Sequence, residues 1–188
     1  MPAAGDRAYD HRVSFVVRTA RPNDLAALLP IEQMADQLFA DVGIVFPPGP
    51  TVIEEAIEDG ADIYVAGEPP VGFAAVRQRD GYSHLEQIAV RTDRSRQGIG
   101  GRLLCRVIAH AAERGSAGVT LLTFRDVPRN GPWYARHGFT ELPAERWTPQ
   151  IQSLWDHEIA AGVHKIGPRL VMYRPSGGQG MRTILPRV

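Results

Sequence analysis

Hydrophobic and polar positions along this chain follow two periods in alternation, which predicts helices interleaved with short strands. The clearest helical pattern spans 100–113, where apolar residues recur every three or four positions and Gly115 ends the run. Short apolar runs bounded by turn residues predict strands, and Asp80-Gly81 is a strong hairpin signal. The predicted strands are 13–18, 62–66, 71–79, 84–90, 119–123, 139–141 and 170–173.

The same pattern predicts several shorter helices. One begins near Asn23 or Asp24 as its cap and ends at Pro30, with a continuation over 32–40. Thr51, followed three residues later by Glu54, has the spacing of a capping box. Further helices are predicted at 51–60, 132–137 and 150–161.

Composition agrees with one enzyme-sized α/β domain. At 188 residues, 44% hydrophobic and 22% charged, the chain can bury a single large core. The formal net charge of +0 gives no bulk attraction to nucleic acid or to a membrane. The single Cys105 excludes an internal disulfide framework, and we expect it to be a half-buried structural thiol. With no signal-peptide pattern and no apolar run of membrane-spanning length, we expect a soluble, cytoplasmic protein.

The most informative stretch, 94–104, joins the apolar run 88–90 to the long helix. The start of a helix leaves about four backbone N–H groups without partners and carries roughly half a positive charge. Glycines there let a phosphate approach the amides closely, and Arg94, Arg96 and Arg102 add positive charge. Two glycines at a helix start cost about 1 kcal/mol each relative to alanine. The stretch therefore predicts a phosphate-binding turn, against the alternative of an ordinary connection with solvated arginines.

Two familiar phosphate motifs are excluded at this turn. No lysine follows the glycines, as a P-loop requires. The dinucleotide fingerprint fails at its third glycine, where Leu103 stands.

What remains resembles the coenzyme A loop of the GNAT acetyltransferase superfamily. The motif Gln/Arg-x-x-Gly-x-Gly/Ala aligns with 95–100, and Ser95 departs from its first position. A second stretch, 130–139, resembles the family motif Asn-x-x-x-x-Tyr-x-x-x-Gly-Phe. Together the two motifs, in the family's order, make a strong resemblance that covers about 13–174.

The resemblance implies a GNAT-like acyltransferase fold, which is α/β with a mixed, mostly antiparallel central sheet flanked by helices. It implies an N-acetyltransferase domain at 13–174. Outside it we expect a flexible arm at 1–12 and, from its Gly-rich composition, a flexible tail at 175–188. The resemblance also implies acetyl-CoA as co-substrate, held by the strand 88–90, by the loop and by the Asn of the second motif. The implied coenzyme-binding residues are Ile88, Ala89, Val90, Ser95, Arg96, Gln97, Gly98, Ile99, Gly100, Gly101 and Asn130.

Acetyl transfer to an amine needs a group that takes the amine's proton and a group that gives one to the leaving thiolate. Tyr134 of the second motif is the candidate acid, since a phenol of ordinary pKa, about 10, can protonate a thiolate of similar basicity. Glu86 is the candidate base, and alternation places it on the same strand face as His84, a weaker candidate. Each of these three side chains could instead have a purely structural role. His84-x-Glu86 lacks the paired cysteines of a zinc deaminase, so no metal is expected.

The acceptor is less defined by the sequence. In the GNAT fold, specificity for the acceptor usually depends on two segments, which here are 31–60 and 148–163. The first of them carries three acids beside three apolar side chains: Glu32, Asp36 and Asp41 beside Met34, Phe39 and Phe46. We expect direct transfer to a primary amine of a small molecule or peptide, and the resemblance leaves room for a homodimer. Two alternatives stay open: a non-catalytic acyl-CoA-binding or regulatory module, and a nucleotide-binding α/β protein.

Overall fold

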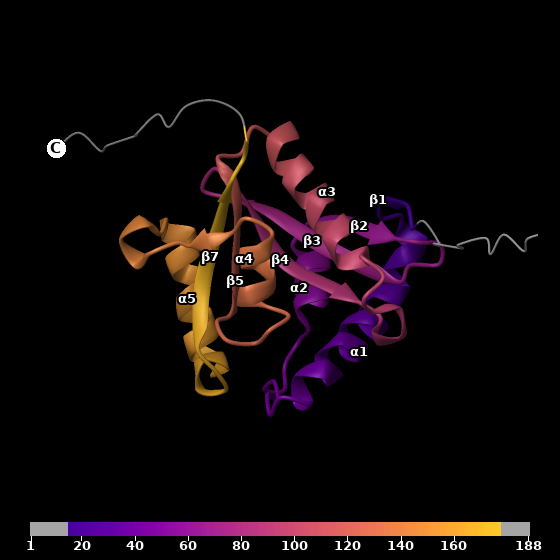
Figure 1. Ribbon diagram of the computed structural model, residues 1–188, viewed down its shortest axis with the longest axis horizontal. Helices are drawn as coiled ribbons and strands as arrows, with labels where there is room; N and C mark the ends of the chain where they lie inside the picture. The colour runs from indigo at the N-terminus through magenta and orange to yellow at the C-terminus, as the bar shows by residue number, and fades with distance from the viewer. Residues whose placement is uncertain (1–14, 178–188) are drawn as a thin grey trace, which may run out of the picture.

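A seven-stranded sheet runs through the protein, whose computed structural model describes residues 15–177 (Figure 1). The strand order is β1-β2-β3-β4-β5-β7-β6; β4 and β5 are parallel and the other neighbouring pairs are antiparallel. The predicted mixed, mostly antiparallel sheet is therefore confirmed. The strands are β1 (Val17–Thr19), β2 (Asp62–Ala66), β3 (Gly72–Arg79), β4 (Tyr82–Val90), β5 (Gly118–Phe124), β6 (Thr140–Glu141) and β7 (Arg169–Pro175).

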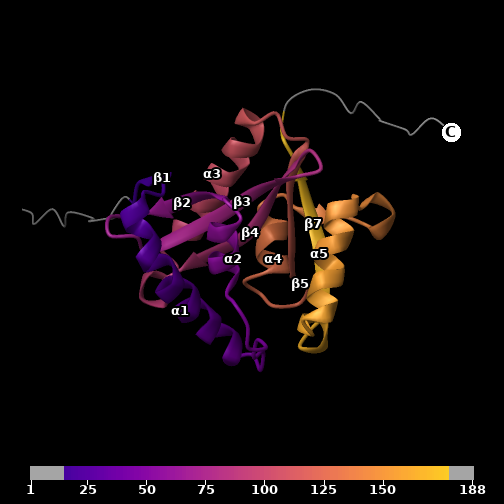
Figure 2. The ribbon, with the colours of Figure 1, turned by 180° about the vertical axis from the view of Figure 1, so that it is seen from behind.

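Helices cover both faces of this sheet (Figure 2). On one face α3 and α4 pack on β3, β4 and β5; on the other, α1 and α2 pack on β2, β3 and the end of β4, and α5 packs on β5 and β7. The helices are α1 (Leu28–Ala40), α2 (Val52–Glu58), α3 (Ile99–Glu113), α4 (Gly131–Arg136) and α5 (Pro149–Ala160), with 3-10 turns at Pro22–Ala27, Thr92–Arg94, Ala144–Arg146 and Val163–Lys165.

Local sequence signals account for several element ends. The capping box at the start of α2 forms, since Thr51 accepts from the Glu54 amide and the Glu54 side chain accepts from the Thr51 amide. Asp80 and Gly81 both have positive φ, 47° and 82°, as a tight hairpin between β3 and β4 requires.

The predicted helix boundary at Pro30 is wrong. α1 begins at Leu28 and runs through Pro30 to Ala40. Pro30 is the third residue of α1, in the first turn, where a backbone N–H has no helical acceptor and a proline costs little.

The core on one side of the sheet is built by the apolar stripe of α3. Leu103, Leu104, Val107 and Ala111 are fully buried against β3, β4 and β5. Cys105 lies on the opposite, solvent side of this helix, so the expectation of a half-buried thiol is wrong.

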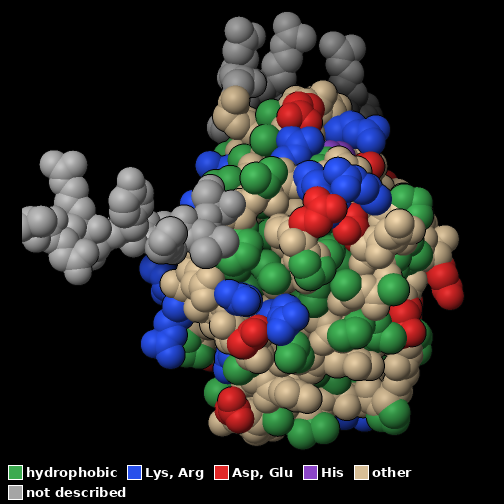
Figure 3. Space-filling view, turned by 90° about the vertical axis from the view of Figure 1, so that its right-hand side faces the viewer, with side chains coloured by type: hydrophobic (Ala, Val, Ile, Leu, Met, Phe, Trp, Pro, Cys, Tyr) green, Lys and Arg blue, Asp and Glu red, His purple; other side chains and the backbone are tan. Residues whose placement is uncertain are grey.

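The ends of the predicted domain are only partly covered by the structure. The predicted arm, 1–12, lies outside the described residues, as do 178–188 of the predicted tail. β7 continues to Pro175, one residue beyond the predicted end of the domain. Within 15–177, every helix is too short or too polar to span a bilayer. On the face seen in Figure 3, basic and acidic side chains lie next to one another, in keeping with ion pairs such as Arg114–Asp62 at 3.0 Å.

Candidate active site

The two central strands separate part of the way along their length. β4 and β5 are joined by two residue pairs, Ser83–Val119 and His84–Thr120. β4 continues for six residues beyond His84, paired with β3 alone. A β-bulge accompanies the separation, because the register passes from Ala75–Gln87 to Val76–Leu85 and leaves Glu86 as the extra residue. Alternate backbone groups of residues 85–90 therefore face a gap rather than a neighbouring strand.

The start of α3 lies beside the end of this gap. Gly98 caps the helix with φ of 76°, and the first helical hydrogen bond joins the Arg102 amide to the Gly98 carbonyl at 3.1 Å. The amides of residues 99–101 precede that bond, so they are the donors that a phosphate could use. The predicted turn thus leaves three backbone amides outside the helical hydrogen bonds, and the phosphate site itself stays a prediction.

Packing within the protein does not explain Gly100. A methyl group there would lie 3.7 Å from Trp133 Cζ2 and 3.9 Å from Val90 Cγ2, which are ordinary contact distances. The glycine instead leaves space where the start of α3, the end of β4 and α4 converge. This vacant Cβ position fits the close approach of a ligand to the helix amides.

The charge expected near this turn is only partly available. Arg94 lies 3.9 Å from the Asp93 carboxylate, which also pairs with Arg91. Arg102 is exposed and donates to the Phe15 carbonyl at 3.3 Å. Backbone amides are therefore the better-supported part of the anion site.

Asn130 is held at the opposite side of the gap, just before α4. Its Nδ2 donates to Thr123 Oγ1 on β5 at 3.0 Å, and its Oδ1 is buried without a hydrogen-bond partner among the described residues. An unsatisfied buried acceptor costs about 1–3 kcal/mol. Gly131 fixes the turn, because a Cβ there would lie 2.5 Å from the Arg125 carbonyl oxygen. The described part of the chain therefore offers this amide oxygen no donor, and the amide-containing arm of coenzyme A could supply one.

We expect Asn130→Ala to weaken binding of coenzyme A about 10-fold, since one hydrogen bond from a buried group is worth about 1–1.5 kcal/mol. Asn23→Ala is the matched control, because Asn23 is exposed in the first 3-10 turn. Calorimetric titration with coenzyme A measures both. Equal affinities in the two variants would contradict a role for Asn130.

Tyr134 lies on α4 in the same region and is 7% exposed. Its ring packs edge-on against Trp133 and Phe139, with centroids 4.9 and 5.6 Å away. Burial raises the pKa of the phenol well above its ordinary value, opposed in part by Arg169. The sequence-based assumption of an unperturbed phenol is therefore wrong. The phenol stays protonated at neutral pH, and the same burial would penalise a thiolate beside it.

Glu86 and His84 share one face of β4, as alternation predicted, and it is the face opposite to the one that α3 and α4 cover. Their environments differ. Glu86 pairs with Arg79, whose Nη2 lies 2.7 Å from Oε1. Burial raises the pKa of Glu86, and Arg79 opposes that shift. His84 is buried, with Nδ1 2.9 Å from Thr120 Oγ1; burial and the charges of Arg79 and Arg77 lower its pKa to about 3. Glu86 is thus the better proton acceptor of the two.

Two residues near the site, Arg79 and Thr123, carry no signal in the sequence that would have predicted them. Arg79 and Thr123 were not singled out, although they hold Glu86 and Asn130. His137 packs against Trp133 with ring centroids 4.3 Å apart. Among the described residues, no group of three or more His, Cys, Asp or Glu side chains could hold a metal ion.

Comparisons with known proteins agree with this geometry. Residues 59–141 match the model of the acetyltransferase (GNAT) domain. An uncharacterised N-acetyltransferase of Bacillus subtilis, YjcF, is 30% identical over 114 residues, which are 58% of this chain and 79% of that protein.

Solved structures of several acetyltransferases share the fold. The ribosomal-protein-S18-alanine N-acetyltransferase of Escherichia coli superposes with a TM-score of 0.64 at 20% identity, over 92% of this chain and all of that one. N-acetylglutamate synthase of Neisseria gonorrhoeae, complexed with coenzyme A and N-acetyl-glutamate, gives 0.63 at 19% identity, over 88% of this chain and 36% of that one. By its site motifs, its fold and its relative in Bacillus, the chain belongs to the GNAT acetyltransferase family.

Proposed function

We propose that this protein is an acetyl-CoA-dependent N-acetyltransferase that moves an acetyl group directly to a primary amine in a ternary complex. The observation that carries the proposal is the buried Oδ1 of Asn130, which has no hydrogen-bond partner within residues 15–177 and lies on the side of the β4–β5 gap opposite the α3 amides. These groups suit the two polar parts of coenzyme A, its amide-containing arm and its diphosphate. When bound, the coenzyme would supply the acetyl thioester.

The residues proposed to hold it form a continuous path. The amides of Ile99, Gly100 and Gly101, with the turn Ser95-Arg96-Gln97-Gly98, would bind the diphosphate. Ile88, Ala89 and Val90 would bind the arm through backbone groups that face the gap, where the Ile88 amide now donates to Gln87 Oε1 at 3.1 Å and would exchange that bond for one to the arm. Asn130 would accept a hydrogen bond from the arm. Trp133 lies between the start of α3 and Tyr134, which links the path to the proposed acid.

Proton transfer is assigned to two side chains. Tyr134 would give its proton to the sulfur as the carbon–sulfur bond breaks, and would later regain one from solvent. Glu86 would take the amine's proton, directly or through water, as nitrogen bonds to the carbonyl carbon. Cys105 faces solvent from α3, which supports direct transfer over an acyl-cysteine intermediate.

We expect Glu86→Gln to lower kcat/KM about 10²-fold near neutral pH, within the range for loss of a general base. The loss should shrink at high pH, because the amine is then already neutral. Profiles of kcat/KM against pH, measured well below the variant's Tm, test this. The temperature must stay well below this Tm because the substitution removes the charged partner of Arg79 and can lower the stability of the fold.

Glu113→Gln is the control for this experiment, since it also breaks an arginine pair but on the exposed side of α3. A ratio of wild-type to Glu86→Gln rates that stays constant across pH, with KM unchanged, would remove Glu86 from the mechanism.

A further inference from the structure

From Glu32 onward, α1 crosses the face of the sheet where β4 and β5 separate. Glu32 reaches β4, where its Oε1 accepts from Gln87 Nε2 at 2.9 Å. Phe39 reaches β5, with its ring centroid 5.7 Å from that of Phe124. Asp36 is four residues after Glu32 and three before Phe39, so all three occupy one face of the helix. The Asp36 carboxylate therefore faces the interval between the two strands.

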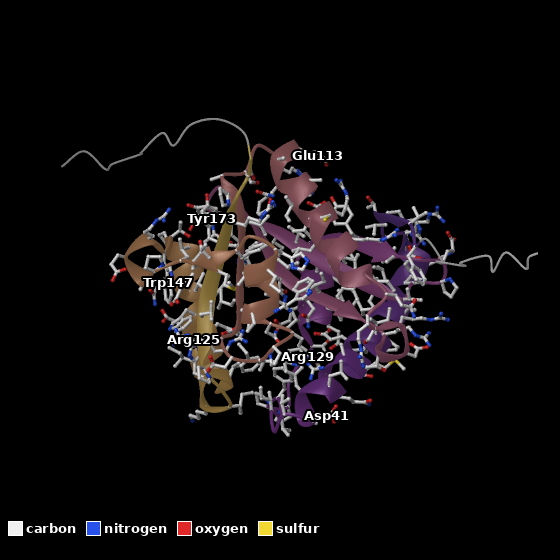
Figure 4. The ribbon with its side chains drawn as sticks, viewed as in Figure 1. Asp41, Glu113, Arg125, Arg129, Trp147 and Tyr173 are labelled. Carbon is white, nitrogen blue, oxygen red and sulfur yellow. The ribbon has the colours of Figure 1, made fainter. Side chains whose placement is uncertain are left out.

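An aromatic cluster lies at the end of β5, and its member Phe39 follows Asp36 by one helical turn on α1. The rings of Phe39, Phe46 and Phe124 pack with centroids 5.2 to 6.1 Å apart. A cavity of about 320 Å³ lies against Phe124, between the loops that follow α1, β5 and α5. Figure 4 shows Asp41, Arg125 and Arg129 at this edge of the molecule. The cavity is lined by Val42, Ile44, Phe124, Asp126, Val127, Pro128, Ile166, Gly167 and Pro168.

The cavity is close to the proposed coenzyme arm. The Asn130 amide donates to the Val127 carbonyl at 2.8 Å, which closes a turn. Such a turn keeps the two Cα atoms within about 7 Å of each other. Arg129 ties the same loop to α1, since it donates to the Leu38 carbonyl and lies over the Phe39 ring. A molecule in this cavity would thus lie within reach of a thioester held by Asn130.

Charge around the site favours a single cation. Burial, with the neighbouring charge of Glu32, raises the pKa of Asp36 to about 6, so this carboxylate is negative at neutral pH. Glu32 itself is engaged, because it also accepts from the amides of Val52 and Ile53. The other charged or titratable groups on elements packed against α1 include His84 and Glu86 on β4, Arg77 and Arg79 on β3, Glu54, Glu55 and Glu58 on α2, Asp93 and Arg94 in the 3-10 turn after β4, and Arg129 after β5.

We propose that Asp36 binds the acceptor's ammonium group and that the cavity beside Phe124 holds an apolar body attached to it. The acceptor class is a primary monoamine with an aromatic or branched aliphatic group. This rests on the proposed acetyl transfer and adds to it the chemistry of the substrate. A polyamine or an aminoglycoside fits less well, because Asp126 is the one charged residue among those that line the cavity.

Binding of two probe amines to the protein saturated with coenzyme A tests the proposal. We expect 2-phenylethylamine to bind at least 10-fold more tightly than 2-aminoethanol, which carries the same ammonium without the apolar body. Asp36→Asn should weaken 2-phenylethylamine about 10-fold at pH 7.5. Glu145→Gln, in the exposed 3-10 turn Ala144–Arg146, should not change it.

The pH dependence of that affinity separates an ammonium-binding role from a structural one. Wild-type affinity should fall below about pH 6 as Asp36 gains a proton, whereas Asp36→Asn should be flat there. The raised pKa also means that the folded state disfavours the carboxylate, so Asp36→Asn should raise the Tm at pH 7.5. A residue that served the fold alone would lower the Tm on substitution.

The apolar part is tested by Ile166→Ala, which trims a side chain that lines the cavity and should weaken 2-phenylethylamine while leaving 2-aminoethanol unchanged. Equal binding of the two amines, or undetectable binding of both, would overturn the acceptor class. Unchanged affinity in Asp36→Asn would overturn the role of Asp36. If the amines bind as expected but are not acetylated, this inference is supported and the proposed activity is contradicted. If Asp36→Asn acetylates amines at the wild-type rate and KM, the proposed activity is supported and the role of Asp36 is contradicted.

Discussion

Gly100→Val should abolish the stabilisation that acetyl-CoA gives the wild-type protein. At about 100 times its dissociation constant, a ligand that binds only the folded state adds roughly 2.7 kcal/mol, which raises the Tm by several degrees. The valine side chain would occupy the vacant position between Trp133 and Val90, where the ligand must approach the α3 amides. Thermal melts with and without acetyl-CoA measure the effect.

Ala109→Val is the control for this substitution, since it adds a branched side chain to the exposed face of the same helix. It should keep the full ligand-induced shift. The account of the phosphate site would be contradicted if Gly100→Val retained that shift, or if NAD or ATP raised the wild-type Tm more than acetyl-CoA does.

Tyr134→Phe should lower kcat about 10²-fold while leaving the affinity for acetyl-CoA nearly unchanged. The ring and its contacts with Trp133 and Phe139 are retained, so the Tm should change little. Because burial raises the pKa of this phenol, no loss of activity from its ionisation is expected up to at least pH 9.

Tyr82→Phe, at the start of β4, provides the comparison, because its ring packs against Tyr173 at the other end of the strand. It should turn over at the wild-type rate. If Tyr134→Phe also kept the wild-type kcat, under conditions where the chemical step limits the rate, Tyr134 would be a packing residue only.

Local signals in the sequence predicted most of the elements that position the site. The stripe of α3, the glycines at its start and the Asp80-Gly81 hairpin are each encoded within a few residues, so pattern alone locates them. Pro30 shows the limit of such rules. The same residue ends a helix or sits in its first turn, and the choice depends on where tertiary packing begins the helix.

Contacts between distant segments could not be predicted in the same way. The bulge at Glu86 and its ion pair with Arg79 depend on the register of two strands, and a one-residue irregularity leaves no clear pattern in the sequence. Asp36 stood out only as one of several acids on a helix. Its position opposite the strand gap follows from what Glu32 and Phe39 contact across the sheet.

Mass analysis of a primary-amine panel after incubation with acetyl-CoA tests the central claim most directly, provided that thiol release is followed in the same reaction. The account predicts that at least one amine gains one acetyl group and that one thiol appears for each acetylated product. It also predicts that Tyr134→Phe slows both together. Binding of coenzyme A with no acetylated amine, and with thiol release no faster than spontaneous hydrolysis, would contradict it. Such a result would instead identify the protein as a non-catalytic acyl-CoA-binding module of the GNAT fold.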